Sequence, residues 1–189
     1  MTEKEKMLAG EPYNSRDPEL LAMYLAARDR LKAAQAVSPA DFAGRVAALR
    51  QLFGRLGDGS WIELPFHCDY GENIRIGADC FVNANCVFLD CNRITIGDGV
   101  LIGPAVQLYA PTHPLNAAER LPAPGAHYVT SAKPIAIGDR CWIGGGTIVM
   151  PGVTIGARTT IGAGSVVTTS IPADSLAVGN PCRVVRRLA

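Results

Sequence analysis

The sequence is poor in aromatic residues, in histidine and in net charge. Of its 189 residues only 6% are Phe, Trp or Tyr, three are His, and the formal net charge is +1. Such a chain presents neither a basic field for nucleic acid nor an acidic tail, so a charged ligand must be held by a local cluster. Nucleic-acid binding is therefore not expected.

Long hydrophobic runs are also lacking. No stretch approaches the roughly 18 apolar residues that a membrane span requires. The first ten residues, MTEKEKMLAG, are charged and contain no apolar signal region. We expect a soluble, cytoplasmic protein with no membrane partner.

Residues 1–60 are predicted to form a small helical domain. The stretch SRDPELLAMYLAARDRL offers Asp17 as an N-cap and Pro18 at the first helical position, with apolar residues at positions 20, 21, 24, 25 and 31. A second helix is expected from Ser38 and Pro39 to Gly57, with Asp41 near its start and an apolar side. That side comprises Phe42, Val46, Leu49, Phe53 and Leu56.

Residues 61–189 show a different pattern, an apolar residue at every sixth position. The repeated positions are Ile76, Val82, Phe88, Ile96, Ile102, Leu108, Ile137, Ile143, Val149, Ile155, Ile161 and Val167. Glycine often follows the apolar residue directly, and a small or branched residue stands four places after many of the apolar positions. This period fits neither a helix nor a simple alternating strand. It indicates short strands that point one large and one small side chain into a narrow interior.

The cysteines fit this repeat better than a disulfide framework. They are six, an even number, but Cys80, Cys86 and Cys141 occupy the small inward position of the repeat. We predict reduced, packed cysteines and no metal site among them.

The repeat is interrupted between Leu108 and Ile137. The intervening sequence YAPTHPLNAAERLPAPGAHYVTSAKP is rich in proline and alanine, so residues 109–136 are expected to leave the scaffold as a loop. This loop carries His113 and His127, two of the three histidines. A histidine whose pKa lies near neutrality suits proton transfer.

The chain resembles the maltose and galactoside O-acetyltransferases, a family of hexapeptide-repeat acyltransferases. The resemblance rests on the repeat, on THP at 112–114, and on the segments EKEKMLAGEPY, FHCDYGENIRIG, CWIGGGTIVMPGVTIG and VGNPCRVVR, and it covers essentially the whole chain. It implies a left-handed parallel β-helix with a small N-terminal helical domain and a protruding loop. It also implies acetyl transfer from acetyl-CoA to a sugar hydroxyl, with no metal required, by a homotrimer whose active sites lie between subunits.

The resemblance assigns residues to this reaction. His113 corresponds to the catalytic base, and Asn83 to a residue that contacts the acceptor and assists the transition state. Asp69 and Asp90 correspond to acceptor-binding carboxylates, which suit sugar hydroxyls because each oxygen accepts two hydrogen bonds. The implied cofactor-binding residues are Gly145, Ala163, Thr168, Thr169, Arg183 and Arg186.

Chemistry supports several of these assignments independently. Glycine at Gly145 lets a ligand approach backbone N–H groups that stabilise an oxyanion, and Arg183, Arg186 and Arg187 form the local cationic cluster that phosphates require. The sequence departs from the family at two places. Thr169 stands where relatives have a lysine, and GAHYVTSAKP lacks an acidic residue before its tyrosine and is longer than usual.

Three alternatives remain open at this stage. An O-acetyltransferase for antibiotics or other xenobiotics, built on the same fold, would also use a loop histidine. A β-helix carbonic anhydrase needs three zinc-binding histidines, but His67, His113 and His127 are spaced unlike that family's cluster. A non-catalytic β-helix scaffold would favour a regular threonine array, which this chain lacks.

Overall fold

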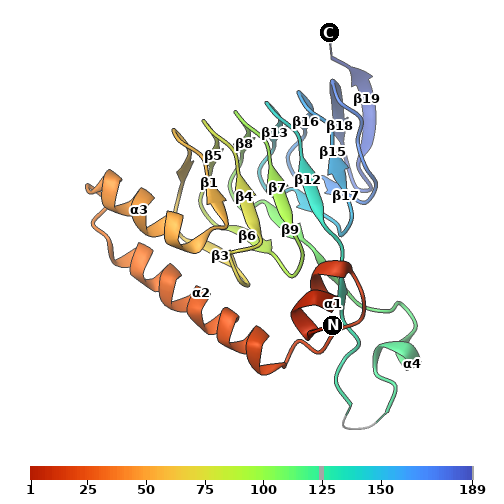
Figure 1. Ribbon diagram of the computed structural model, residues 1–189. Coiled ribbons are helices and arrows are strands. Elements are labelled where there is room, and N and C mark those ends of the chain that lie inside the picture. Colours follow the sequence, from red (N-terminus) through yellow and green to blue (C-terminus); the bar gives the residue numbers. More distant parts are fainter. Residues whose placement is uncertain (124–125, 189) are drawn as a thin grey trace.

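The computed structural model describes residues 1–123 and 126–188, and most of them form a three-sided prism of parallel strands (Figure 1). Face 1 consists of β1 (Arg55–Leu56), β4 (Ile74–Ile76), β7 (Ile94–Ile96), β12 (Ile135–Ile137) and β15 (Thr154–Ile155). Face 2 consists of β2 (Trp61–Ile62), β5 (Phe81–Val82), β8 (Leu101–Ile102), β13 (Trp142–Ile143), β16 (Thr160–Ile161), β18 (Ser175–Val178) and β19 (Arg183–Arg187). Face 3 consists of β3 (Phe66–Cys68), β6 (Cys86–Leu89), β9 (Gln107–Tyr109), β14 (Ile148–Val149) and β17 (Val166–Val167).

The six-residue period builds the interior of the prism. On face 1, Ile76 pairs with Ile96 and Ile96 with Ile137, so equivalent residues stack directly above one another. All twelve apolar positions of the predicted repeat are buried, with at most 2% of each side chain exposed. The parallel β-helix expected from the sequence is confirmed. The six cysteines are all buried and free, and Cys80, Cys86 and Cys141 lie inside the prism as predicted.

The turns between the faces are tight and repeat from coil to coil. The row of turns that joins face 2 to face 3, here called the 2/3 edge, comprises residues 83–85, 103–105, 144–146 and 162–164. Its third positions, Asn85, Ala105, Gly146 and Gly164, all have φ between 56° and 70°. Gly144 is required for another reason, because an added Cβ would lie 2.4 Å from the backbone nitrogen of Ala163 in the next coil.

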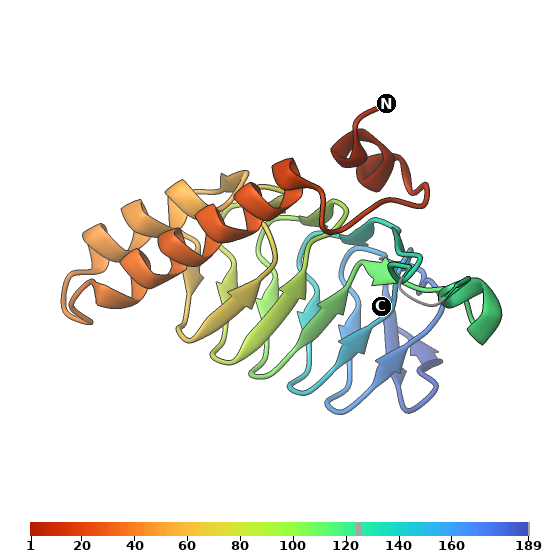
Figure 2. The same cartoon turned by 90° about the horizontal axis from the view of Figure 1, so that it is seen from below.

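Three helices precede and flank the prism: α1 (Glu3–Ala9), α2 (Pro18–Ala36) and α3 (Phe42–Leu52) (Figure 2). As predicted, Asp17 caps α2 by accepting a hydrogen bond from the N–H of Glu19, and Pro18 is its first residue. Of the five apolar positions expected in this helix, Leu20 and Leu31 are buried, whereas Leu21, Tyr24 and Leu25 are partly exposed. No helix among the described residues is long and apolar enough to cross a membrane.

The second predicted helix is shorter at both ends than expected. Asp41, not Ser38, is the N-cap of α3, and its carboxylate accepts from the N–H of Gly44. The helix stops at Leu52, because Leu56 pairs with Ile76 as the first rung of face 1. The β-helix therefore begins at Arg55, on the N-terminal side of the boundary expected near residue 60. Phe42 is 63% exposed rather than part of a buried helix side.

The segment expected as a loop over 109–136 is an arm with a short two-stranded base. β10 (Pro111–Thr112) pairs antiparallel with β11 (Ser131–Ala132), and the chain is back in face 1 at Ile135. A single helical turn, α4 (Ala117–Arg120), lies on the arm, below and to the right of α1 in Figure 1. Residues 124–125 of the predicted loop lie outside the described residues.

Candidate active site

His113 follows β10 directly and is held by the returning strand of the arm. Its Nδ1 lies 2.9 Å from the carbonyl oxygen of Val129. A carbonyl only accepts, so this contact places the proton on Nδ1 and leaves the lone pair on Nε2. The His113 ring also packs edge-on against Tyr128, with 6.4 Å between the ring centroids. The imidazole is thus presented in the tautomer that a general base requires.

A cavity of about 340 Å³ opens beside this imidazole. Asp69 lies in its wall, so the structure brings together two of the residues singled out in the sequence. The complete lining is Tyr13, Ser15, Leu21, Tyr24, Asp69, Tyr70, Cys91, His113 and Thr130. We call this space the His113 cavity. It combines aromatic walls with one carboxylate and one imidazole.

The carboxylate of Asp69 is half-buried in this cavity. Burial raises its pKa, and a hydrogen bond from the Cys91 thiol (3.3 Å between Sγ and Oδ2) and the charge of Arg28 partly oppose that rise. An oxygen acceptor in an apolar wall suits a hydroxyl donor, because a buried polar group needs a partner.

Asp90 does not line the cavity, and its predicted role in acceptor binding stays a prediction. Its side chain is fully buried, and its carboxylate accepts hydrogen bonds from the backbone N–H groups of Asp69 (2.9 Å), Tyr70 (2.8 Å) and Asn73 (3.3 Å). Burial raises the pKa of Asp90 to about 6, although these donors lower it. Asp90 instead fixes the turn that carries Asp69. The neighbouring residue Cys91 lines the cavity in its place.

Asn83, Gly145 and Ala163 gather along the 2/3 edge. The N–H groups of Asn83 and Gly144 donate to Ile102 and Ile161 in the following coils, so these corners lie in register. Asn83 is half-buried, and its side-chain oxygen accepts from the N–H of Ala84 at 2.8 Å. None of these residues lines the His113 cavity. Within one subunit the two groups of predicted site residues are separate.

The 2/3 edge also presents backbone donors. Gly144 and Gly146 use their N–H groups within the prism, donating to Ile161 and Pro104, and Gly162 and Gly164 donate in the same way to Ala177 and Gly145. Among the backbone hydrogen bonds of the described residues, the N–H groups of Gly145 and Ala163 have no such partner. The predicted cofactor-binding role of these two residues stays a prediction.

The predicted phosphate-binding residues lie nearer the C-terminal end. Arg183 begins β19, directly after Cys182, whose N–H donates to Val166 just beyond the 2/3 edge. Arg183 and Arg186 are exposed, and within the described chain neither forms an ion pair with a carboxylate. Thr168 and Thr169 are exposed on the turn from face 3 to face 1.

Comparison with known proteins agrees with this architecture. Residues 6–57 match the model of the maltose acetyltransferase hexapeptide capping motif, and residues 134–169 match that of the bacterial transferase hexapeptide with six repeats. Nodulation protein L of Rhizobium meliloti is 47% identical over 183 residues, which are 97% of either chain. The chain belongs to the hexapeptide-repeat acetyltransferases.

Solved structures agree with this family assignment. A maltose O-acetyltransferase from Clostridium difficile superposes with a TM-score of 0.95 at 42% identity, over 100% of this chain and 98% of the other. A hexapeptide-repeat acetyltransferase from Vibrio cholerae, complexed with acetyl coenzyme A, superposes with a TM-score of 0.89 at 44% identity over the full length of both chains.

Several residues that line the His113 cavity have no signal in the sequence. Tyr13, Tyr24 and Tyr70 line the His113 cavity, but they come from the segment before α2, from α2 and from the turn after β3. No local pattern connects them. The sequence pattern predicts an apolar helix position at Tyr24. In the structure Tyr24 is partly exposed, and the guanidinium of Arg28 lies 4.3 Å from its ring centroid. This arrangement results from tertiary packing.

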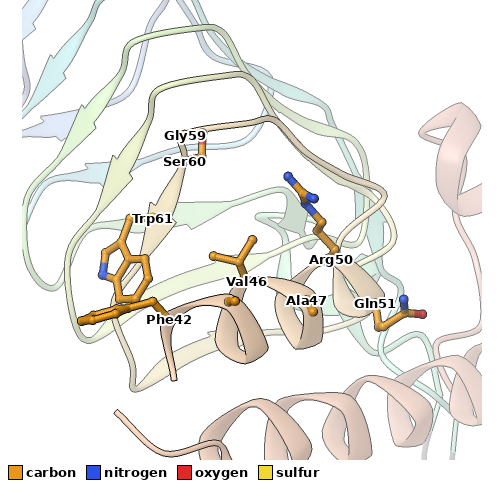
Figure 3. Close-up of a pocket in the computed structure, with 9 residues that line it drawn as sticks. Phe42, Val46, Ala47, Arg50, Gln51, Gly59, Ser60 and Trp61 are labelled. Carbon is orange, nitrogen blue, oxygen red and sulfur yellow. The ribbon is translucent and has the colours of Figure 1, made fainter. Parts of the chain in front are cut away.

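A further cavity of the acetyltransferase lies away from the His113 cavity. It has a volume of about 610 Å³ and lies between α3 and the start of face 2, where Phe42 and Trp61 pack with 5.4 Å between ring centroids (Figure 3). Its charged lining residue, Arg50, is 2.6 Å from Asp58. None of the residues predicted to act in catalysis lines it.

The three histidines do not converge. His113 and His127 line a second cavity of about 270 Å³ that adjoins the first, whereas His67 lies exposed on the outer side of β3. In the described ranges no group of three or more His, Cys, Asp or Glu residues is arranged to hold a metal ion. This layout does not provide the three-histidine zinc site of a carbonic anhydrase.

Proposed function

We propose that this acetyltransferase transfers the acetyl group of acetyl-CoA to a hydroxyl of a sugar, with His113 as the general base. The observation that carries the proposal is the pairing of a tautomer-fixed imidazole with a carboxylate in one small cavity with aromatic walls. The C. difficile relative is a maltose O-acetyltransferase, which supports a sugar acceptor, and the V. cholerae relative binds acetyl coenzyme A.

The reaction follows from the geometry of His113. Nε2 removes the proton from the acceptor hydroxyl as its oxygen attacks the thioester carbonyl carbon. A C–O bond forms, and negative charge develops on the carbonyl oxygen. The C–S bond then breaks, and the imidazolium returns its proton to the departing thiolate. The products are the acetyl ester and free coenzyme A. The hydrogen bond from Nδ1 to Val129 stabilises the imidazolium between these steps.

Asn83 and the N–H of Gly145 are proposed to stabilise the developing oxyanion. Fixed donors in a water-poor cleft are effective because they need no reorganisation when charge appears. Ala163, Thr168 and Thr169 are proposed to contact the pantetheine and nucleotide parts of acetyl-CoA, with Arg183 and Arg186 at its phosphates. Asp69 binds a second hydroxyl of the acceptor and orients it toward His113.

His113 and the 2/3 edge lie apart within one subunit, and we propose that a homotrimer brings them together between subunits. Face 2 provides a surface for such association. Its outward side chains Trp61, Phe81, Leu101 and Trp142 stack in register, and Leu101 and Trp142 are 52% and 57% exposed. A contiguous apolar stripe of this kind is a typical subunit contact. The outward column of face 1, with Arg55, Arg75 and Thr95, is polar.

Introducing a charge into this stripe should dissociate the trimer. We expect Leu101→Asp to sediment as a monomer and to lose at least about 99% of turnover, because burying an unpaired carboxylate costs several kcal/mol. Thr154→Asp on face 1 is the matched control and should stay trimeric and active. A wild-type protein that is an active monomer, or an L101D variant that remains assembled and active, would overturn the shared site.

An acceptor panel tests the proposed substrate class. Maltose, glucose, a galactoside and hydroxylated antibiotics are offered with acetyl-CoA, and release of free thiol is followed. We expect kcat/KM for the best sugar to exceed that for the antibiotics by about 100-fold, the discrimination that a few matched hydrogen bonds provide. Preference for an antibiotic would indicate the xenobiotic enzyme instead. Thiol release with none of them would contradict the sugar assignment.

A further inference from the structure

We propose that Asn92 is a positioning residue for catalysis: its buried amide fastens helix α1 to the base of the arm that carries His113. Asn92 is 1% exposed. Its Nδ2 donates to the backbone carbonyls of Met7 (3.0 Å), Leu8 (3.3 Å) and Ala132 (3.2 Å). One side chain thus joins the end of α1, the first turn after β6 and strand β11. The inference rests on the proposed role of His113.

The arm needs such an attachment because its own base is minimal. β10 and β11 pair over two residues each, and an isolated two-stranded ribbon is at best marginally stable in water. A second contact comes from the N-terminal segment, where the N–H of Tyr13 donates to the carbonyl of Thr130 at 3.0 Å in an isolated antiparallel bridge. Residues from the start of the chain therefore complete the base of the arm.

A separate hydrophobic cluster lies beneath these contacts. It consists of Met7, Tyr13, Leu20, Tyr70, Cys91 and Ala132, and it is distinct from the cluster that fills the prism. Tyr13, Tyr70 and Cys91 also line the His113 cavity. The wall of the cavity and the anchorage of α1 thus share three side chains of this cluster, which we call the α1 cluster (Figure 1 shows α1 beside the arm).

The connection to the imidazole is short. The carbonyl of Val129 accepts from Nδ1 of His113. The next residue is Thr130, which bonds to Tyr13, and two residues after Thr130 comes Ala132, which bonds to Asn92. When α1 is released, the segment from Val129 to Ala132 loses its outer support, and the His113 ring loses its fixed tautomer and direction. A misplacement of about 1 Å at a reacting group can cost roughly 10²-fold in rate.

The test uses the full-length protein with Asn92→Asp. This change keeps the shape of the side chain but sets a carboxylate oxygen against three carbonyl oxygens. We expect kcat to fall by roughly 10- to 100-fold with KM for acetyl-CoA within about twofold, because the 2/3 edge is untouched. The ¹⁵N shifts of His113 should move from a fixed Nδ1–H tautomer toward a mixture. Met7→Ala, which weakens the α1 cluster without altering Asn92, should act in the same direction.

The control is Ile155→Val in the core of the prism, which lowers the melting temperature but should leave kcat and the His113 shifts unchanged. If Asn92→Asp and Met7→Ala both keep kcat within twofold and the His113 tautomer intact, while His113→Ala is inactive, the positioning role is wrong and the general-base role stands. If His113→Ala itself remains active, the proposed function fails, and the ¹⁵N shifts still decide whether Asn92 orders the ring. Should N92D fail to fold, the Met7→Ala variant decides on the same two readouts.

Discussion

His113→Ala is expected to lower turnover by roughly 10²–10⁴-fold, the range for loss of a positioned general base. The affinity for acetyl-CoA should barely change, because none of the predicted cofactor residues lines the His113 cavity. The melting temperature should also stay nearly constant, since an exposed arm residue contributes little to the core. Turnover, cofactor affinity and melting are measured on the same purified protein.

His67→Ala is the matched control for this variant. His67 is an exposed histidine on the outer side of β3 and lines neither cavity that His113 lines. Its replacement should leave turnover unchanged. A residual activity in His113→Ala above about a tenth of wild type would contradict the general-base role, as would a loss of stability that accounts for the lost activity.

The second large effect is expected at the cofactor phosphates. Replacing both Arg183 and Arg186 with alanine should raise KM for acetyl-CoA by about 10²-fold or more, because each charge-assisted hydrogen bond contributes about 1.5–3 kcal/mol. Both side chains are exposed, so water screens them and the lower end of this range applies. With Thr169 at the position where relatives have lysine, these two arginines carry more of the binding. KM is measured at low and moderate ionic strength.

A double variant on face 1 controls for the change in net charge. Arg55→Ala with Arg75→Ala removes the same two charges from face 1, where these residues are register partners. Its KM should equal that of wild type. An unchanged cofactor affinity in the Arg183 and Arg186 variant, or an equal rise in both double variants, would show that these residues do not hold the phosphates.

Leu56 and Ile76 show where a local sequence pattern is sufficient to predict the structure and where it is not. Ile76 starts a run of apolar residues spaced six apart (Ile76, Val82 and Phe88), and each coil of a solenoid contacts only its neighbours, so its burial could be predicted from nearby residues. Leu56 also fits the spacing of a helix that starts at Ser38. Its pairing with Ile76, twenty positions away, ends the helix instead. Tertiary pairing overrides helical spacing at this position.

The sequence by itself determined the repeat, the buried ladders, the cap of α2, the position of the arm and the family. These features depend on residues that are near one another in the chain. Only the tertiary structure decided that Asp90 lies beneath Asp69, that three tyrosines and Cys91 surround His113, and that Asn92 ties α1 to the arm. The cavity joins positions from 13 to 130, and α2 contributes Leu21 and Tyr24 to its wall. The spacing of residues in the sequence does not predict such contacts, because each contact depends on how separate elements pack and not on the spacing within one element.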